Sequence, residues 1–174
     1  SKLIKKSNNP IILVGAGFSR SQKNLNLLSK INEKNIPISS TWGGQKIQQY
    51  YQKMHNYIGL MGNHNPGLAN KLIRNSDLVI ALGCSLLQHQ VGKEQDSFAP
   101  NAKIIFVNND LNECKRARLQ FGKRLRSVNL DVTNFINYFL KIKKKKRYIK
   151  YTKYSDTKCL PVNYLKNILQ NVKK

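Results

Sequence analysis

Two glycines near the start of the chain stand where a phosphate could bind. Gly15 and Gly17 follow the apolar run 11–14 and precede a segment with helical spacing, and Arg20 comes three residues later. Glycines at such a turn let backbone N–H groups approach a phosphate at the positive end of a helix. Arg20 stands where a dinucleotide fingerprint has its third glycine, so the fingerprint is incomplete. A tight strand-to-helix turn is the alternative role for the glycines, and Arg20 is either a phosphate partner or a solvated cation.

A second group of polar residues follows two later apolar runs. Gly83, Cys84 and Ser85 come after residues 77–82, and Asp110 comes shortly after residues 103–107. If these runs are strands of a doubly wound sheet, their carboxyl ends are where ligands bind. Asp110 either accepts ribose hydroxyls or caps the next helix. Cys84 adjoins an apolar strand, so we interpret it as a buried, inert thiol.

No catalytic set can be assembled from the remaining polar residues. The histidines fall in expected loops without zinc-site spacing: His55, His64 and His89. The sequence contains no HExxH, no Gly-x-Ser-x-Gly elbow and no GxxxxGK[ST] loop. We therefore predict a binding fold with no catalytic residue and no metal site in this chain.

The charge of the chain is concentrated at its two ends. The 174 residues hold 31 Lys+Arg and 8 Asp+Glu, a net charge of +23. Residues 1–9 and 141–174 together carry +14 of it, and the densest run is 143–147. We interpret this as a solvated, lysine-rich linker, with a patch for nucleic acid or anionic lipid as the alternative. RNA-binding signatures are absent, so no nucleic-acid partner is expected.

The expected location is the cytoplasm, with no membrane partner. No apolar run approaches the ~20 residues of a membrane span, and the start has no apolar signal-peptide core. The three cysteines are widely spaced and form no CxxC, which argues against a disulfide framework.

Short apolar runs alternate with helical spacing through the middle of the chain. Strands are predicted over residues 11–14, 36–39, 77–82, 103–107 and, more weakly, 126–130. Helices are predicted over 21–34 and 112–119, from Asn65 as an N-cap before Pro66, and after Asp131. Residues 40–64 and 83–101 are predicted as long loops. This alternation is typical of a doubly wound α/β fold, Rossmann-like, with a mostly parallel sheet and helices on both faces.

The organisation along the chain predicts one domain with additions at each end. Residues 1–9 read as the end of an interdomain linker, and 10–140 as a nucleotide-binding-like domain. Residues 141–159 read as a basic linker. An apolar stripe at helical spacing within 160–174 reads as the start of a further, C-terminal domain.

Six motifs follow one another over residues 8–140. They are NPIILVGAGFS (9–19), IPISSTWGGQ (36–45), GLMGNHNPGLAN (59–70), SDLVIALGCSL (76–86), FAPNAKIIFVNNDLNE (98–113) and VNLDV (128–132). In this order they resemble the central domain of thiamine-diphosphate-dependent enzymes of the acetolactate synthase type. The tail CLPVNYLKNILQNV at 159–172 resembles the entry into the third domain of such enzymes.

The resemblance implies a six-stranded parallel sheet that acts as a non-catalytic spacer. In that family the flanking N- and C-terminal domains bind thiamine diphosphate and Mg²⁺, so this chain alone is expected to bind neither. The parent enzyme would be a lyase or transferase acting on 2-keto acids, as a homodimer or homotetramer. Central domains of the family hold FAD in acetolactate synthases and ADP in some relatives. The candidate cofactor-binding residues here are Gly15, Gly17, Arg20, Gly83, Ser85 and Asp110.

Departures from the family pattern indicate that nucleotide binding is vestigial or weak. FAD-binding members carry an arginine where Ser85 stands, an acidic residue where Asn108 stands and a glycine where Asn65 stands. One alternative is enzymatic, since GAGFSRS at 15–21 is similar to the opening of NAD-dependent sirtuin deacylases. Against it, the zinc cysteine pairs of that family are missing, and the region around His64 lacks its Gln-Asn-x-Asp context. The other alternative is a basic nucleic-acid-binding module.

Overall fold

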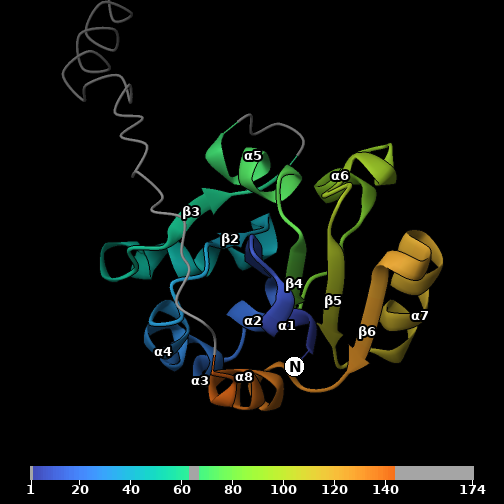
Figure 1. Ribbon diagram of the computed structural model, residues 1–174. Helices are drawn as coiled ribbons and strands as arrows, with labels where there is room; N and C mark the ends of the chain where they lie inside the picture. The colour runs from blue at the N-terminus through green and yellow to red at the C-terminus, as the bar shows by residue number, and fades with distance from the viewer. Residues whose placement is uncertain (1, 63–66, 144–174) are drawn as a thin grey trace, which may run out of the picture.

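Six parallel strands form a single sheet in this computed structural model, which describes residues 2–62 and 67–143 (Figure 1). The strand order is β3-β2-β1-β4-β5-β6, and every neighbouring pair is parallel. The strands are β1 (Pro10–Val14), β2 (Ile38–Ser40), β3 (Tyr57–Leu60), β4 (Leu78–Leu82), β5 (Lys103–Asn108) and β6 (Leu125–Asn129). This order is that of a doubly wound sheet whose direction of winding reverses between β1 and β4. The predicted fold class is confirmed.

The two central strands are buried on both faces, as their unbroken apolar runs predict. Every residue of β1 and β4 is buried. The register places Ile12 opposite both Ile38 and Ile80. Parallel sheets covered on both faces favour β-branched and aliphatic residues without alternation. Edge strand β6 is exposed or half-buried beyond Leu125, which explains its weaker signal in the sequence.

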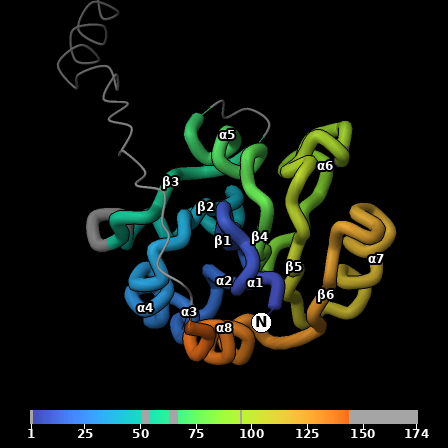
Figure 2. Tube along the Cα trace, in the orientation of Figure 1, coloured from blue at the N-terminus to red at the C-terminus, as the bar shows by residue number. Residues whose placement is uncertain are grey.

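Helices cover both faces of the sheet. One face carries α1 (Lys2–Lys6), α2 (Ala16–Ser19), α3 (Gln22–Asn26), α4 (Leu28–Asn32) and α8 (Val132–Lys141). The other carries α5 (Leu68–Arg74), α6 (Gln88–Val91) and α7 (Leu111–Phe121). Figure 2 shows α3 and α4 beside α8, at the end of the first layer.

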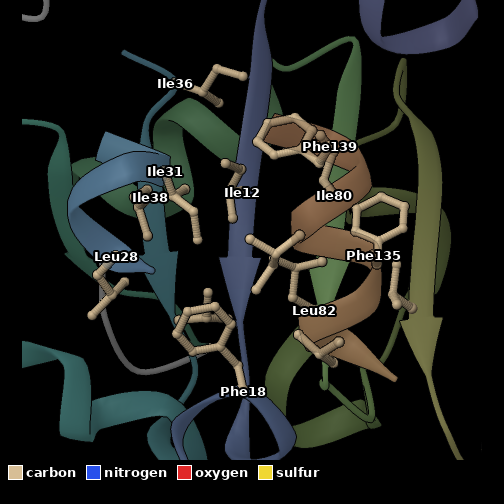
Figure 3. Close-up of a cluster of buried hydrophobic side chains, with 14 of the residues drawn as sticks. Ile12, Phe18, Leu28, Ile31, Ile36, Ile38, Ile80, Leu82, Phe135 and Phe139 are labelled. Atoms are coloured by element: carbon tan, nitrogen blue, oxygen red, sulfur yellow. The ribbon is translucent and has the colours of Figure 1, made fainter. Parts of the chain in front are cut away.

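Alternate strand residues supply the two halves of the core. Ile12, Ile80 and Leu82 face the α8 layer, where they pack with Phe135 and Phe139 (Figure 3). The residues between them, such as Leu13, Val79 and Ala81, face the α5–α7 layer. Because successive strand side chains point to opposite faces, each strand stabilises both layers at once.

Three segments differ from the predicted elements. The helix predicted over 21–34 is divided at Leu27 (φ −89, ψ −4), so α3 and α4 run as two short pieces. The loop predicted over 40–64 contains η1 (Trp42–Lys53), a 3₁₀ helix, and the short strand β3. Gly59 at φ +98 interrupts β3, which weakens its strand pattern. The loop predicted over 83–101 contains α6 and η2 (Gln95–Ser97), both very short.

Some predictions fall on residues that the structure does not describe. Asn65, Pro66 and His64 lie outside the described residues, as do residues 144–174. The helix predicted to begin after an Asn65 cap is α5, which begins at Leu68 with Gly67 as its N-cap. Of the predicted linker at 1–9, residues 2–6 form α1, and Ile4 is buried against the sheet. Among the described helices, none has the length and apolar character needed to cross a membrane.

Candidate functional site

The candidate site lies where β1 and β4 end side by side. Leu82 of β4 pairs with Val14 of β1, so the loops that follow these strands leave the sheet together. One loop contains Gly15 and Gly17, and the other contains Gly83. The carboxyl ends at the point of reversed winding are where open α/β sheets bind ligands. The fold therefore brings together the glycines that the sequence singled out.

The two glycine loops contact each other through their backbones. Gly17 N donates to Gly83 O at 2.9 Å, and Gly15 N donates to Leu82 O at 3.0 Å. A Cβ on Gly15 would lie 2.3 Å from Gly83 O, and one on Gly83 would lie 2.5 Å from Phe18 N. Gly83 also has φ +59, a conformation that favours glycine. Because these glycines have no side chain, the backbones of the two loops can lie close together.

This contact limits what the first loop can offer a phosphate. The N–H groups of Gly15 and Gly17 are already donated to carbonyls of β4 and its loop. Helix α2 has only four residues, and its N-cap Gly15 provides no side-chain cap. Arg20 lies at the C-terminal end of α2, where it is exposed. The first loop thus has the position of a phosphate-binding loop, but the N–H groups of Gly15 and Gly17 form hydrogen bonds within the protein.

The segment after β2 closes over the same loop. Thr41 N donates to Val14 O at 3.0 Å, and Ser19 Oγ donates to Gly44 O at 2.9 Å. A Cβ on Gly44 would lie 2.3 Å from Val14 O. Trp42 remains 68% exposed at this edge of the sheet. Three loops therefore interlock around the end of β1.

Side chains from β5 and α7 hold the carbonyls after Gly83. Asn108 Nδ2 donates to Cys84 O at 3.1 Å, and Gln120 Nε2 donates to Leu86 O at 3.0 Å. Arg116 Nη2 donates to Ser85 O between them. Sequence reasoning missed Arg116 and Gln120, because their spacing on α7 resembles that of any solvated helix face.

Arg116 is itself held in place by an acidic neighbour. It forms an ion pair with Glu113 at 2.9 Å, one turn earlier on α7. Both side chains are about one-third exposed, so the pair adds little stability by itself. Its effect is to orient the guanidinium toward the loop that contains Ser85.

Asp110 caps α7, one of the two roles that the sequence left open. Its Oδ1 accepts from Asn112 N at 2.8 Å and from Glu113 N at 3.3 Å. Asn108 Oδ1 in turn accepts from Asp110 N at 3.0 Å. The Asp110 side chain is exposed beyond the end of β5, next to the loop that follows β4. A ribose role for Asp110 would have to coexist with this cap.

The thiol of Cys84 is sealed beneath the glycine loops. Cys84 is 2% exposed, and its Sγ lies 3.5 Å from Leu13 O and 3.7 Å from Leu82 O. Burial raises the pKa of this thiol far above its usual range, and the Leu82 carbonyl opposes this only slightly. The predicted buried thiol is confirmed, and a thiol that stays protonated is a poor nucleophile. Desolvation also raises the pKa of Cys114.

The described residues contain no cluster of three or more His, Cys, Asp or Glu side chains that could hold a metal ion. His55 lies between Asn32 and Asn35, with ring nitrogens 2.9 Å from Asn32 Nδ2 and 2.6 Å from Asn35 Oδ1. His89 is exposed on α6. Around the candidate site, the described side chains include the amides of Asn108 and Gln120, the guanidinium of Arg116 and the carboxylate of Asp110.

Comparison with known proteins agrees with this geometry. The family model described as "Thiamine pyrophosphate enzyme, central domain" matches residues 1–127. A probable acetolactate synthase large subunit of Methanococcus aeolicus is 34% identical over 131 residues, which are 75% of this chain and 20% of that protein. The acetolactate synthase large subunit of Cyanidium caldarium is 33% identical over 68% of this chain and 20% of its own length.

A relative with a different name matches a shorter region. The 3D-(3,5/4)-trihydroxycyclohexane-1,2-dione hydrolase of Listeria monocytogenes serotype 4b is 32% identical over 62% of this chain and 16% of that protein. This chain therefore spans about a fifth of the length of the acetolactate synthase large subunits that it matches.

Proposed function

The chain belongs to the family of thiamine pyrophosphate enzyme central domains, and on that premise we propose that it is the middle part of a longer enzyme of the acetolactate synthase type. The family match is the observation that carries this proposal. The share of the relatives that the chain covers, about a fifth, is what one domain of such an enzyme would span. Residues 10–140 would form the central domain, 141–159 a linker, and 160–174 the start of a C-terminal domain.

In this proposal the chain supplies structure and the flanking domains supply chemistry. Thiamine diphosphate provides a carbanion-stabilising group that acts on 2-keto acids. The proposal places that cofactor and its Mg²⁺ on the flanking domains, as the family resemblance implies. The catalytic groups would belong to the N- and C-terminal domains of a lyase or transferase that assembles as a homodimer or homotetramer. Its cytoplasmic location is supported by the buried free thiols of Cys84 and Cys114.

Nucleotide binding at the candidate site is proposed to be vestigial. FAD or ADP would have to bind through Gly15, Gly17, Arg20, Gly83, Ser85 and Asp110. The N–H of Gly17 is donated to Gly83 O, and Asp110 caps α7. Arg116 donates to the backbone carbonyl of Ser85, at the position where FAD-binding relatives carry an arginine side chain. These residues fit a stabilised loop cluster better than they fit a dinucleotide.

Turnover measurements test the catalytic part of the proposal. The 174-residue chain with thiamine diphosphate and Mg²⁺ is expected to consume no pyruvate. The enzyme read from the complete reading frame is expected to consume pyruvate or another 2-keto acid, and to lose this activity when the thiamine cofactor is removed. Turnover by the chain alone, or a complete reading frame without flanking domains, would overturn the assignment.

A thermal-shift titration tests the nucleotide part. Ligand that binds only the folded state raises stability by RT ln(1 + [L]/Kd), so the absence of binding leaves Tm unchanged. We expect FAD and ADP to leave Tm of the chain unchanged within error. A rise of several degrees with either nucleotide would show that the site is functional.

A further inference from the structure

An open apolar groove lies on the α8 face of the sheet, away from the glycine loops. Its volume is about 480 Å³, and it is bounded by α1, β5, β6 and α8. Its floor includes Ile105 and Val128, and its rim includes Leu130 and Tyr138. These two rim side chains are 38% and 53% exposed, although they are large and apolar. Exposed apolar side chains around a hollow indicate a surface that another group covers.

The first turn of α1 forms one wall of this groove. Lys2, Leu3 and Ile4 all line it, and Ile4 is only 3% exposed. Figure 1 shows α1 near α8, the helix that forms the opposite wall. Asp77 fixes the chain just after α1, because it accepts from Asn8 N at 2.6 Å and from Asn9 N at 3.0 Å. Because Lys2 lines the groove, a polypeptide that joins α1 from its N-terminal side would start beside the groove.

The charges around the groove restrict what can cover it. Lys2 and Arg126 are among its lining residues, and no acidic side chain is. Residues 144–174 of this chain carry ten basic side chains and one acidic side chain. Like charges disfavour that tail as the occupant. An occupant with apolar residues on one side and acidic residues beside Lys2 and Arg126 would be complementary.

We propose that the groove is the interdomain seat of the polypeptide that connects the preceding thiamine-diphosphate-binding domain to α1. The inference rests on the proposed function, in which such a domain precedes this one. Helical continuation of α1 places the residues four and seven positions before Ile4 on the same face as Ile4. The occupant is thus an amphipathic segment with apolar residues at those positions and an acidic residue near Lys2 or Arg126. Its role is to anchor the central domain to the preceding one.

Photo-cross-linking in the complete enzyme tests which segment occupies the groove. Tyr138 is replaced by p-benzoylphenylalanine, and the cross-linked peptides are identified by mass spectrometry. We expect cross-links to residues within about ten positions before Ser1, since an α-helix rises 1.5 Å per residue. A second probe at Leu130 guards against a cross-linker that itself blocks docking. The matched control is Leu119 on α7, which is 89% exposed on the other face.

Each result of this experiment supports or overturns the proposal. Cross-links from both groove positions to the preceding segment, absent from position 119, support it. Cross-links to the C-terminal domain, to residues 144–174 or to a second copy overturn it, and so does the absence of cross-links at both positions. Pyruvate turnover is measured on the same preparation. If the enzyme turns over 2-keto acids but the expected cross-links are absent, the preceding segment does not occupy the groove, and the proposed function is unaffected.

Discussion

The end of β1 and the groove beside α8 differ in how closely the surrounding parts of the chain pack together. At the end of β1, backbone groups of three loops are so close that no Cβ fits on Gly15, Gly83 or Gly44. Beside α8, about 480 Å³ stays open between apolar side chains. Doubly wound sheets bind ligands at the first of these places, and no motif marks the second. The difference teaches that glycines in a loop indicate a close approach to its backbone. The group that approaches can be another loop of the same chain instead of a ligand.

Replacing Gly83 by Ala is the strongest way to break this comparison. A Cβ there would lie 2.5 Å from Phe18 N at φ +59, so we expect unfolding free energy to fall by about 3 kcal/mol or more. Gly122 is the matched control, because it has φ +52 and nothing within 4 Å of its Cβ position. Gly122 has φ 52 and ψ −135, so Gly122→Ala should cost only the backbone strain, about 1 to 3 kcal/mol. If urea unfolding gives equal losses of unfolding free energy for Gly83→Ala and Gly122→Ala, the loops after β1 and β4 move apart at little cost.

The pH dependence of stability tests how well the closed loops seal Cys84. Its pKa is raised by burial, so the folded state keeps the proton after the unfolded chain has lost it. The stabilising contribution is therefore complete below the unfolded pKa, near 8.5, and decreases as pH rises above it. Between pH 8 and 10 the wild type should lose about 2 kcal/mol more than Cys84→Ala does. If the unfolding free energies of the wild type and Cys84→Ala, measured in urea, fall equally between pH 8 and 10, the Cys84 thiol is accessible to water in the folded state.

Substitution of Asp110 separates its cap from a ribose role. Asp110→Ala should lower the unfolding free energy by about 1 kcal/mol, because Asn112 N and Glu113 N lose their acceptor. Asp110→Asn should restore most of this, since asparagine caps helices about as well. If FAD stabilises the wild type but neither variant, the Asp110 carboxylate binds the nucleotide in addition to capping α7.

The smallest effect is expected in the open groove. Tyr138→Ser in the 174-residue chain should change the unfolding free energy by less than about 0.5 kcal/mol, because Tyr138 is 53% exposed. Leu119→Ser on α7 should behave alike and serves as the control. A loss above about 1 kcal/mol for Tyr138→Ser alone would mean that something in this chain already covers the groove.

The central strands β1 and β4 were predictable because each is a short apolar run that the sheet buries on both faces. Residues 11–14 lie between Pro10 and Gly15, residues 78–82 lie between Asp77 and Gly83, and both runs are apolar throughout. Strand β3 was not predicted, since Gly59 has an unusual backbone conformation and only Tyr57 is buried. The division at Leu27 was also missed, because Leu25, Leu28 and Ile31 keep their apolar spacing across it and all three remain buried.

The position of the candidate site followed from the sequence, whereas its contacts did not. Gly15 and Gly83 end neighbouring strands, which the alternation of elements predicts. That Gly17 N donates to Gly83 O depends on two segments 66 residues apart in the chain, and nothing local encodes it. The groove was unpredictable for the same reason, because its walls come from α1, β5, β6 and α8. The cap at Asp110 was foreseen as one of two roles, since capping is local.

The strand order also determines how this domain can form while it is being synthesised. In the folded domain Ile12 of β1 pairs with Ile38, which is 26 residues later in the chain, and with Ile80, which is 68 residues later. One side of the central strand must therefore wait unpaired until β4 emerges. Contacts of this separation slow folding and leave an apolar strand edge exposed to aggregation. The rate of translation between β2 and β4 would thus influence the yield of folded chain.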